Sequence, residues 1–266
     1  MSATRAKLPV WRSVAESYVV TIRKLPFLLR VGWLWLVVAF AASFAFRFVL
    51  AWFGFDDEST PLRSLVPQIG TSIIQAFCTA AIAVPWHREI LANAASAFNG
   101  RSKARTILAY ALAAFGLETV FITSYTTITA AVAWGNILTL PAGPTIVMVY
   151  SFLAMPLMIA VIYLWCRFSL ILPSVALDEP ERSLRKTWAA TTGNGWRILF
   201  GGILAIVPIL LLLLLPLPFV DWSSESSASP IYWTAATDMM AVVWIMFGLA
   251  FLSISYRELV QKRAAT

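Results

Sequence analysis

The sequence predicts an all-α membrane protein, a polytopic bundle of six transmembrane helices with both termini in the cytoplasm and short amphipathic helices in the interface. Three observations predict this fold class. Hydrophobic residues make up 60% of the 266 residues and charged residues only 12%, which excludes a soluble domain. Long apolar stretches alternate with short polar segments. The basic residues gather on every second polar segment, as the positive-inside rule requires.

The six apolar stretches form a single membrane domain over residues 1–266. A helix needs roughly 20 apolar residues to cross about 30 Å of hydrocarbon. The stretches that meet this length lie at 31–53, 66–86, 106–134, 145–167, 198–220 and 231–256. A β-barrel would need short strands of alternating polarity, and the leucine run at 210–215 does not alternate.

The charges indicate compartment and orientation. All but Arg47 and Arg63 of the 20 Lys and Arg residues fall on or beside four polar segments, near 1–30, 87–105, 167–197 and 257–266. Acidic residues such as Asp56 and Asp221 mark the opposite side. Because Lys and Arg are retained in the cytoplasm, the chain is expected in the inner membrane of a bacterium. Basic residues spread over four segments predict anionic lipid headgroups as partners and argue against nucleic acid.

Amphipathic helices are expected in three cytoplasmic segments. In the lead-in at 1–30, an apolar row recurs at helical spacing opposite charged residues, and Pro26 ends the run. The row comprises Trp11, Val14, Tyr18, Ile22 and Leu25. A second helix is expected at 90–98, and a third from the N-cap Ser183 to Gly193 with Leu184, Trp188 and Thr191 on one face. These helices either only connect spans or also dock a cytoplasmic protein partner.

Glu118 is the most informative single residue, because a carboxyl group near the bilayer midplane is costly and must face protein or water. Gln75, on the preceding span, reaches a similar depth and is the predicted hydrogen-bond partner. Thr119, Thr123 and Tyr125 continue a polar stripe along the same span. The stripe either lines a pathway, or its threonine hydroxyls bond back to the helix and pack against neighbours.

Arg47 and Asp238 form a second candidate pair. Each lies about 10 Å from the outer end of its span, at a rise of 1.5 Å per residue. Because opposite charges at one depth are less costly paired than alone, the first and last spans are expected to meet there.

Catalytic and metal-binding patterns are not found in the sequence. His87 is the only histidine and is expected at the membrane interface. It cannot form a multi-histidine metal site, and neither a zinc motif, a phosphate-binding glycine loop nor a hydrolase nucleophile elbow accompanies it. No cofactor, metal ion or enzymatic activity is therefore predicted.

The segment from 167 to 197, here called the elbow, reads RFSLILPSVALD at 167–178, SLRKTW at 183–188 and TGNGWR at 192–197. It resembles the cytoplasmic loop of bacterial six-helix inner-membrane proteins related to the membrane domain of some glycerophosphodiester phosphodiesterases. The resemblance implies the membrane module without the phosphodiesterase activity. Pro173 is expected to end the fourth span, and Asp178 to accept bonds from backbone or from Arg167. The candidate elbow residues are Arg167, Asp178, Trp188, Asn194 and Arg197.

Two functions remain open from sequence. The first is a non-enzymatic accessory in transport or in envelope and lipid organisation. The second is a small transporter or channel with a polar route around Glu118. In the elbow, Arg167 and Arg197 either bind lipid phosphate or brace the loop, and both interpretations account for the same residues.

Overall fold

The computed structural model describes residues 7–53, 61–92, 101–138, 144–180, 183–214 and 246–262, and every regular element in these ranges is a helix. Four helices contain segments long and apolar enough to cross a membrane: α2 (Leu25–Trp52), α3 (Pro61–Leu91), α4 (Arg101–Leu138) and α5 (Pro144–Phe168). The chain is therefore an all-helical membrane protein.

The remaining spans are seen in part. The fifth predicted span begins in α8 (Gly195–Leu214), whose apolar segment is shorter. The sixth is described only from residue 246, where a helix runs into a π-helical end at Arg257–Gln261; we call residues 246–262 the C-terminal helix. Because residues 215–245 lie outside the described part, six spans remain a prediction.

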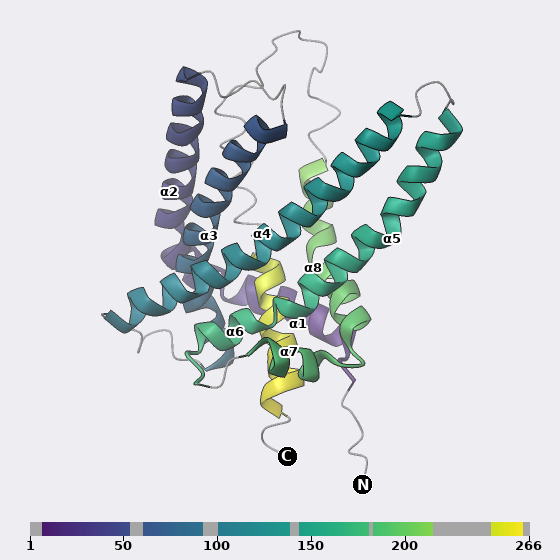
Figure 1. Ribbon diagram of the computed structural model, residues 1–266. Coiled ribbons are helices and arrows are strands. Elements are labelled where there is room, and N and C mark those ends of the chain that lie inside the picture. The colour runs from purple at the N-terminus through teal and green to yellow at the C-terminus, as the bar shows by residue number, and fades with distance from the viewer. Residues whose placement is uncertain are drawn as a thin grey trace.

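Neighbouring helices pack in chain order, α2 on α3, α3 on α4 and α4 on α5, and α8 packs on α5 (Figure 1). One end of the bundle, here the elbow end, gathers α1 (Val10–Arg23), α6 (Ile171–Ala176), α7 (Leu184–Thr191) and the C-terminal helix. The beginning of α1 and the end of the C-terminal helix thus lie at the same end. The predicted second amphipathic helix differs, because Ile90 and Leu91 continue α3 and residues 93–100 lie outside the described part.

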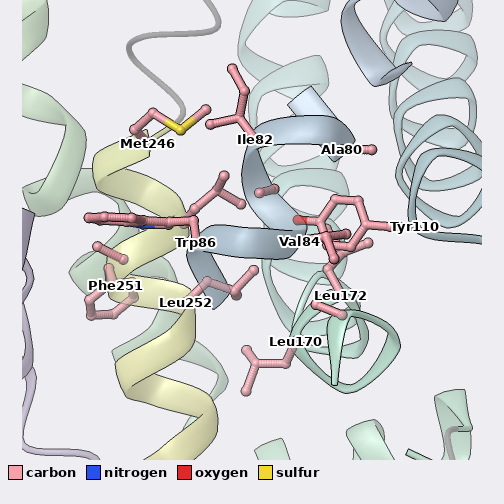
Figure 2. Close-up of a cluster of buried hydrophobic side chains, with 14 of the residues drawn as sticks. Ala80, Ile82, Val84, Trp86, Tyr110, Leu170, Leu172, Met246, Phe251 and Leu252 are labelled. Atoms are coloured by element: carbon pink, nitrogen blue, oxygen red, sulfur yellow. The ribbon is translucent and has the colours of Figure 1, made fainter. Parts of the chain in front are cut away.

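The hydrophobic core lies toward the elbow end and is built around α3. Two-thirds of the apolar segment of α3 is buried (67%), against 17% for α2 and α4. Small residues at 80, 81 and 83 let neighbouring helices approach closely, and Trp86 is fully buried. Figure 2 shows Trp86 beside Phe251 and Leu252 of the C-terminal helix, with Tyr110 of α4 near the same cluster.

The helix α1 has three faces. One face is buried against the protein: Ser13, Val14, Ser17 and Thr21. A second is apolar yet exposed: Trp11, Val19 and Ile22. A third carries charge: Arg12, Glu16 and Arg23. Apolar side chains that point outward while serines point inward are stable where lipid replaces water.

This arrangement corrects the predicted single apolar face of the lead-in. Val14 and Tyr18 turn toward the protein, whereas Trp11 and Ile22 turn outward, being 76% and 65% exposed. The physical reason is that serine and threonine hydroxyls in a helix can bond to carbonyls of their own helix. Ser17 donates to the carbonyl of Val14, and Thr21 to that of Ser17, so this face is buried without loss of hydrogen bonds.

Tyr18 joins α1 to α8 at a point where proline interrupts the α8 ladder. Pro208 has no N–H to donate to the carbonyl of Leu204, four residues earlier. The Tyr18 hydroxyl donates to the carbonyls of Leu204 and Ala205, each at 2.9 Å. Burial raises the pKa of Tyr18 further above its ordinary value, so the hydroxyl that donates here is neutral.

Substitution Tyr18→Phe is expected to lower the free energy of unfolding in detergent by about 1–3 kcal/mol, because it leaves a partly buried carbonyl without a donor. Equilibrium unfolding in SDS, followed by circular dichroism, measures this change. Tyr125→Phe on the exposed side of α4 is the matched control and is expected to change little. Equal effects of the two substitutions would show that the Tyr18 hydroxyl does not support α8.

Candidate functional site

His87 is buried in the protein rather than exposed at the interface, which corrects the sequence expectation. Its side chain is fully buried, and both ring nitrogens have partners. Nδ1 lies 2.6 Å from the hydroxyl of Ser253, and Nε2 lies 3.0 Å from the hydroxyl of Tyr110. The three residues come from α3, the C-terminal helix and α4, so one imidazole connects three helices. We call this cluster the His87 junction.

The bond directions in the His87 junction follow from Ser253. Its hydroxyl donates to the carbonyl of Leu249 at 2.8 Å, so it can accept from His87 but not also donate to it. Because burial disfavours the charged form, we take the imidazole as neutral, with its proton on Nδ1 and with Nε2 accepting from Tyr110. Each donor of this set of hydrogen bonds is then used once. This arrangement holds helices together and leaves no ring nitrogen for a substrate.

Arg167 braces the elbow by binding α7. Its guanidinium donates from Nε to the Thr191 hydroxyl at 2.9 Å and from Nη2 to the Trp188 carbonyl at 3.0 Å. The guanidinium carbon also lies 3.5 Å from the centre of a Trp188 ring, and a weaker 3.4 Å contact reaches the Tyr163 hydroxyl. Stacking on an aromatic ring favours a planar cation. The described contacts of Arg167 thus match the brace interpretation, and they are made with α7 and with Tyr163 of α5 rather than with Asp178.

Asn194 and Arg197 clamp the N-terminal segment. The N–H of Leu8 donates to the Asn194 side chain at 2.8 Å, and Nη1 of Arg197 donates to the Leu8 carbonyl at 2.9 Å. Leu8 itself is fully buried. The two polar groups of one peptide residue are therefore satisfied by side chains almost 190 positions away. No sequence pattern in the lead-in predicted that Leu8 would dock here.

The turn that carries these residues was predicted from its capping residues. Ser183 accepts a hydrogen bond from the Lys186 N–H and begins α7, and Gly193 adopts a φ of 79° after its end. Gly195 begins α8, and a Cβ there would collide with Tyr163. The predicted α7 face is divided: Thr191 is buried, whereas Leu184 and Trp188 remain exposed.

Asp178 and Pro173 occupy other positions than expected. α5 ends at Phe168, and Pro173 lies in the first turn of α6, where a helix tolerates a missing N–H. Asp178 follows α6 with a φ of 59°, a left-handed conformation that aspartate adopts more readily than most residues. It lies close enough to Arg88 for their charges to interact, and Arg88 also donates to the Ala176 carbonyl at 2.7 Å.

Glu118 lies in the α3–α4 contact, as its depth predicted, but with another α3 residue as its described partner. The Ser72 hydroxyl donates to Oε1 of Glu118 at 3.5 Å, a long hydrogen bond. Gln75 lies one turn further along α3 and is partly buried. The Ser72 hydroxyl is thus one described neighbour of the carboxyl, and the bond from Gln75 stays a prediction.

The side chains of the predicted polar stripe of α4 are exposed: Thr119, Thr123 and Tyr125. Thr119 donates to the carbonyl of Phe115, and the neighbouring Thr127 donates to that of Thr123, each at 2.7 Å. These bonds satisfy the hydroxyls within one helix. The predicted contact between Arg47 and Asp238 stays a prediction, because Asp238 lies outside the residues that the structure describes.

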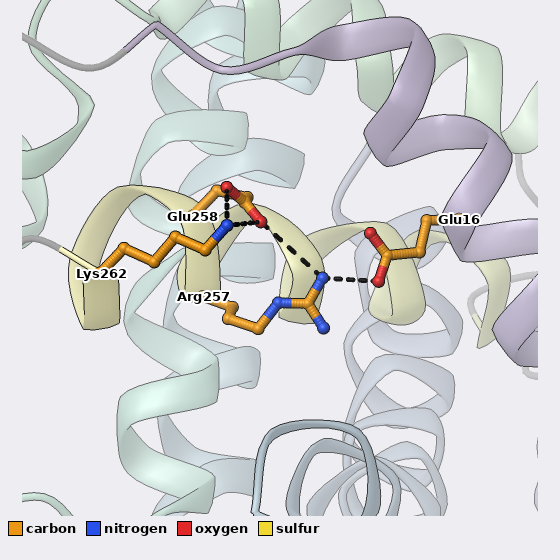
Figure 3. Close-up of polar contacts among 4 residues, drawn as sticks. All are labelled: Glu16, Arg257, Glu258 and Lys262. Atoms are coloured by element: carbon orange, nitrogen blue, oxygen red, sulfur yellow. Dashed lines mark hydrogen bonds and ion pairs between the residues drawn. The ribbon is translucent and has the colours of Figure 1, made fainter.

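The C-terminal helix and α1 meet through a charged network. Arg257 donates to Glu16 at 2.6 Å, and Glu258 accepts from Lys262 at 2.7 Å (Figure 3). Arg257 lies between the two carboxylates in this view, 3.8 Å from Glu258. The network thus joins Glu16 of α1 to the C-terminal helix through Arg257.

Comparison of the chain with protein-family models, with curated proteins and with solved structures finds no match.

Substitution Tyr110→Phe is expected to reduce the free energy of unfolding by about 1–3 kcal/mol, because it leaves a buried imidazole nitrogen without a donor. Unfolding in SDS measures the change, and Thr119→Val on the exposed side of α4 is the control. Ser253→Ala should have a similar cost, and the double substitution should cost less than the sum, since both act through His87. Strict additivity would contradict a connected chain of hydrogen bonds.

Substitution Arg167→Lys keeps the charge but removes the planar group that stacks on Trp188 and reaches Thr191. Amide hydrogen exchange in α7 is expected to rise more than tenfold, because the bonds that hold this short helix to α5 are lost. Arg185→Lys, at an exposed position of α7, should leave exchange unchanged. Equal exchange in the two variants would show that α7 is held by other contacts.

Proposed function

We propose that this protein is a non-enzymatic membrane protein that organises anionic lipid at the cytoplasmic face of a bacterial inner membrane, in support of transport or envelope structure. The observation that carries the proposal is the three-faced helix α1. Its outward apolar row lies beside basic residues, an arrangement that rests on anionic lipid. Six spans with both termini in the cytoplasm belong to this proposal, and they are supported by the gathering of basic segments at the elbow end.

A structural role for the polar residues supports a non-enzymatic function. His87 is the one histidine of the sequence, and its two nitrogens are used inside the protein. Arg167 uses its strongest contacts to hold α7. The side chains best suited to chemistry therefore position helices. The elbow's resemblance to a membrane module without its phosphodiesterase agrees with this interpretation.

The proposal is tested by measuring which lipids the protein immobilises. The protein is reconstituted into phosphatidylcholine vesicles, and electron paramagnetic resonance compares spin-labelled phosphatidylglycerol with spin-labelled phosphatidylcholine. We expect a several-fold preference for the anionic lipid at low salt, weakening as salt screens the basic residues. Equal immobilised fractions for both headgroups would overturn the proposal.

Glu118 supports a second candidate function, a small transporter or channel. Its carboxyl group is half-buried in the contact between α3 and α4, where the Ser72 hydroxyl donates to it at 3.5 Å. A cysteine at position 118, in a chain lacking Cys78 and Cys166, distinguishes the two candidates. Labelling by a membrane-impermeant thiol reagent would show a hydrated route and favour the transporter. A position 118 that stays unlabelled, with a labelled exposed control at Arg185→Cys, would favour the lipid-organising function.

A further inference from the structure

A groove of about 450 Å³ lies between α1 and α8 at the elbow end. Its apolar walls are made by Val10 and Trp11 from α1 and by Trp196, Phe200, Ile203 and Leu204 from α8. Arg197 is the charged residue in the lining. The volume falls within the range of about 300–1,000 Å³ that small-molecule sites occupy.

The large apolar side chains that line the groove have unusually high exposed fractions. Trp11 is 76% exposed, Phe200 57% and Ile203 46%. Trp196, Phe200 and Ile203 recur at helical spacing, so they form one continuous face of α8. From Arg197 to Leu204 this face extends about 10 Å along the helix at 1.5 Å per residue. Such a face is stable when hydrocarbon chains cover it.

Arg197 brings positive charge to one end of this apolar face. One of its nitrogens donates to the Leu8 carbonyl, which holds the side chain in place. A guanidinium has five N–H donors, and among the described residues no carboxylate pairs with this one. Arg197 also lies in the first turn of α8, where the helix dipole adds to the attraction for an anion. Trp11 and Trp196 flank it, and tryptophan favours the headgroup layer of a bilayer.

We infer that this groove binds one anionic phospholipid, with the phosphate on Arg197 and the upper part of one acyl chain along Trp196, Phe200 and Ile203. The inference rests on the proposed function and names the site and the ligand class. Charge complementarity decides the occupant. The groove is apolar along its length and has an arginine at one end, and a phospholipid has an apolar acyl chain with a phosphate in the headgroup at one end. The Leu8 clamp holds both walls, so the site exists before the lipid arrives.

The experiment measures lipid retention by the full-length protein. Protein from vesicles of phosphatidylglycerol and phosphatidylcholine is extracted in mild detergent and analysed by native mass spectrometry. We expect one retained phosphatidylglycerol per chain, retained at least tenfold less by Arg197→Gln. Arg185→Gln, which removes an exposed arginine of α7, should retain lipid as the unmodified protein does.

Arg197 also holds Leu8, so a loss of lipid in Arg197→Gln could come from either contact. A second variant therefore changes the groove and leaves the Arg197–Leu8 contact in place. Ile203→Trp fills the groove without touching Arg197 and should lower retention to the same extent. Leu211→Trp, at an exposed position of α8 outside the lining, is its control. Circular dichroism confirms that each variant is folded. Retention unchanged in both Arg197→Gln and Ile203→Trp would overturn the site.

The outcomes also separate this inference from the proposed function. If no lipid is retained but the spin-label preference for anionic lipid persists, the site is wrong and the proposed function stands. If both are lost, both proposals fail. If a cysteine at position 200 cross-links two copies of the chain and no lipid is retained, the groove is an interface between copies.

Discussion

The neutral imidazole of His87 is the contact on which the elbow end depends. It lies where α3, α4 and the C-terminal helix meet, and each of its nitrogens bonds to a different helix. In an apolar interior a polar group without a partner is costly, so the three helices must stay in one register for the bonds to persist. The hydrophobic cluster around Trp86 packs beside these bonds and involves the same three helices.

Polar contacts between separate segments also hold the elbow in place. Arg167 holds α7 against α5, and Asn194 with Arg197 holds the segment before α1. Each bond joins parts of the chain that are far apart in sequence. These contacts give α1 a defined rotation about its own axis, and that rotation turns Trp11 and Ile22 outward. The outward apolar row of α1 is thus a consequence of polar contacts on the opposite side of the helix.

Neighbouring helices make specific contacts with α8 at its proline and at its first glycine. Pro208 removes a hydrogen bond inside α8, and the Tyr18 hydroxyl of α1 supplies the missing donor. Gly195 lets Tyr163 approach the start of the same helix. The breaks in α8 therefore serve as docking points, and they place the groove with Arg197 beside α1. Lipid organisation, as proposed, would use a surface that these irregular positions create.

The sequence by itself determined the helical class, the presence of four long apolar helices and the ends of α7, because hydrophobic length and capping residues act locally. It also identified Arg167, Asn194 and Arg197 as residues of one elbow. It did not determine that His87 is buried, that Ser72 reaches Glu118, or that α1 turns its serines inward. Those outcomes were decided by the tertiary structure, because each depends on which distant helix supplies a hydrogen-bond partner. The periodicity of residues along one helix does not indicate that partner.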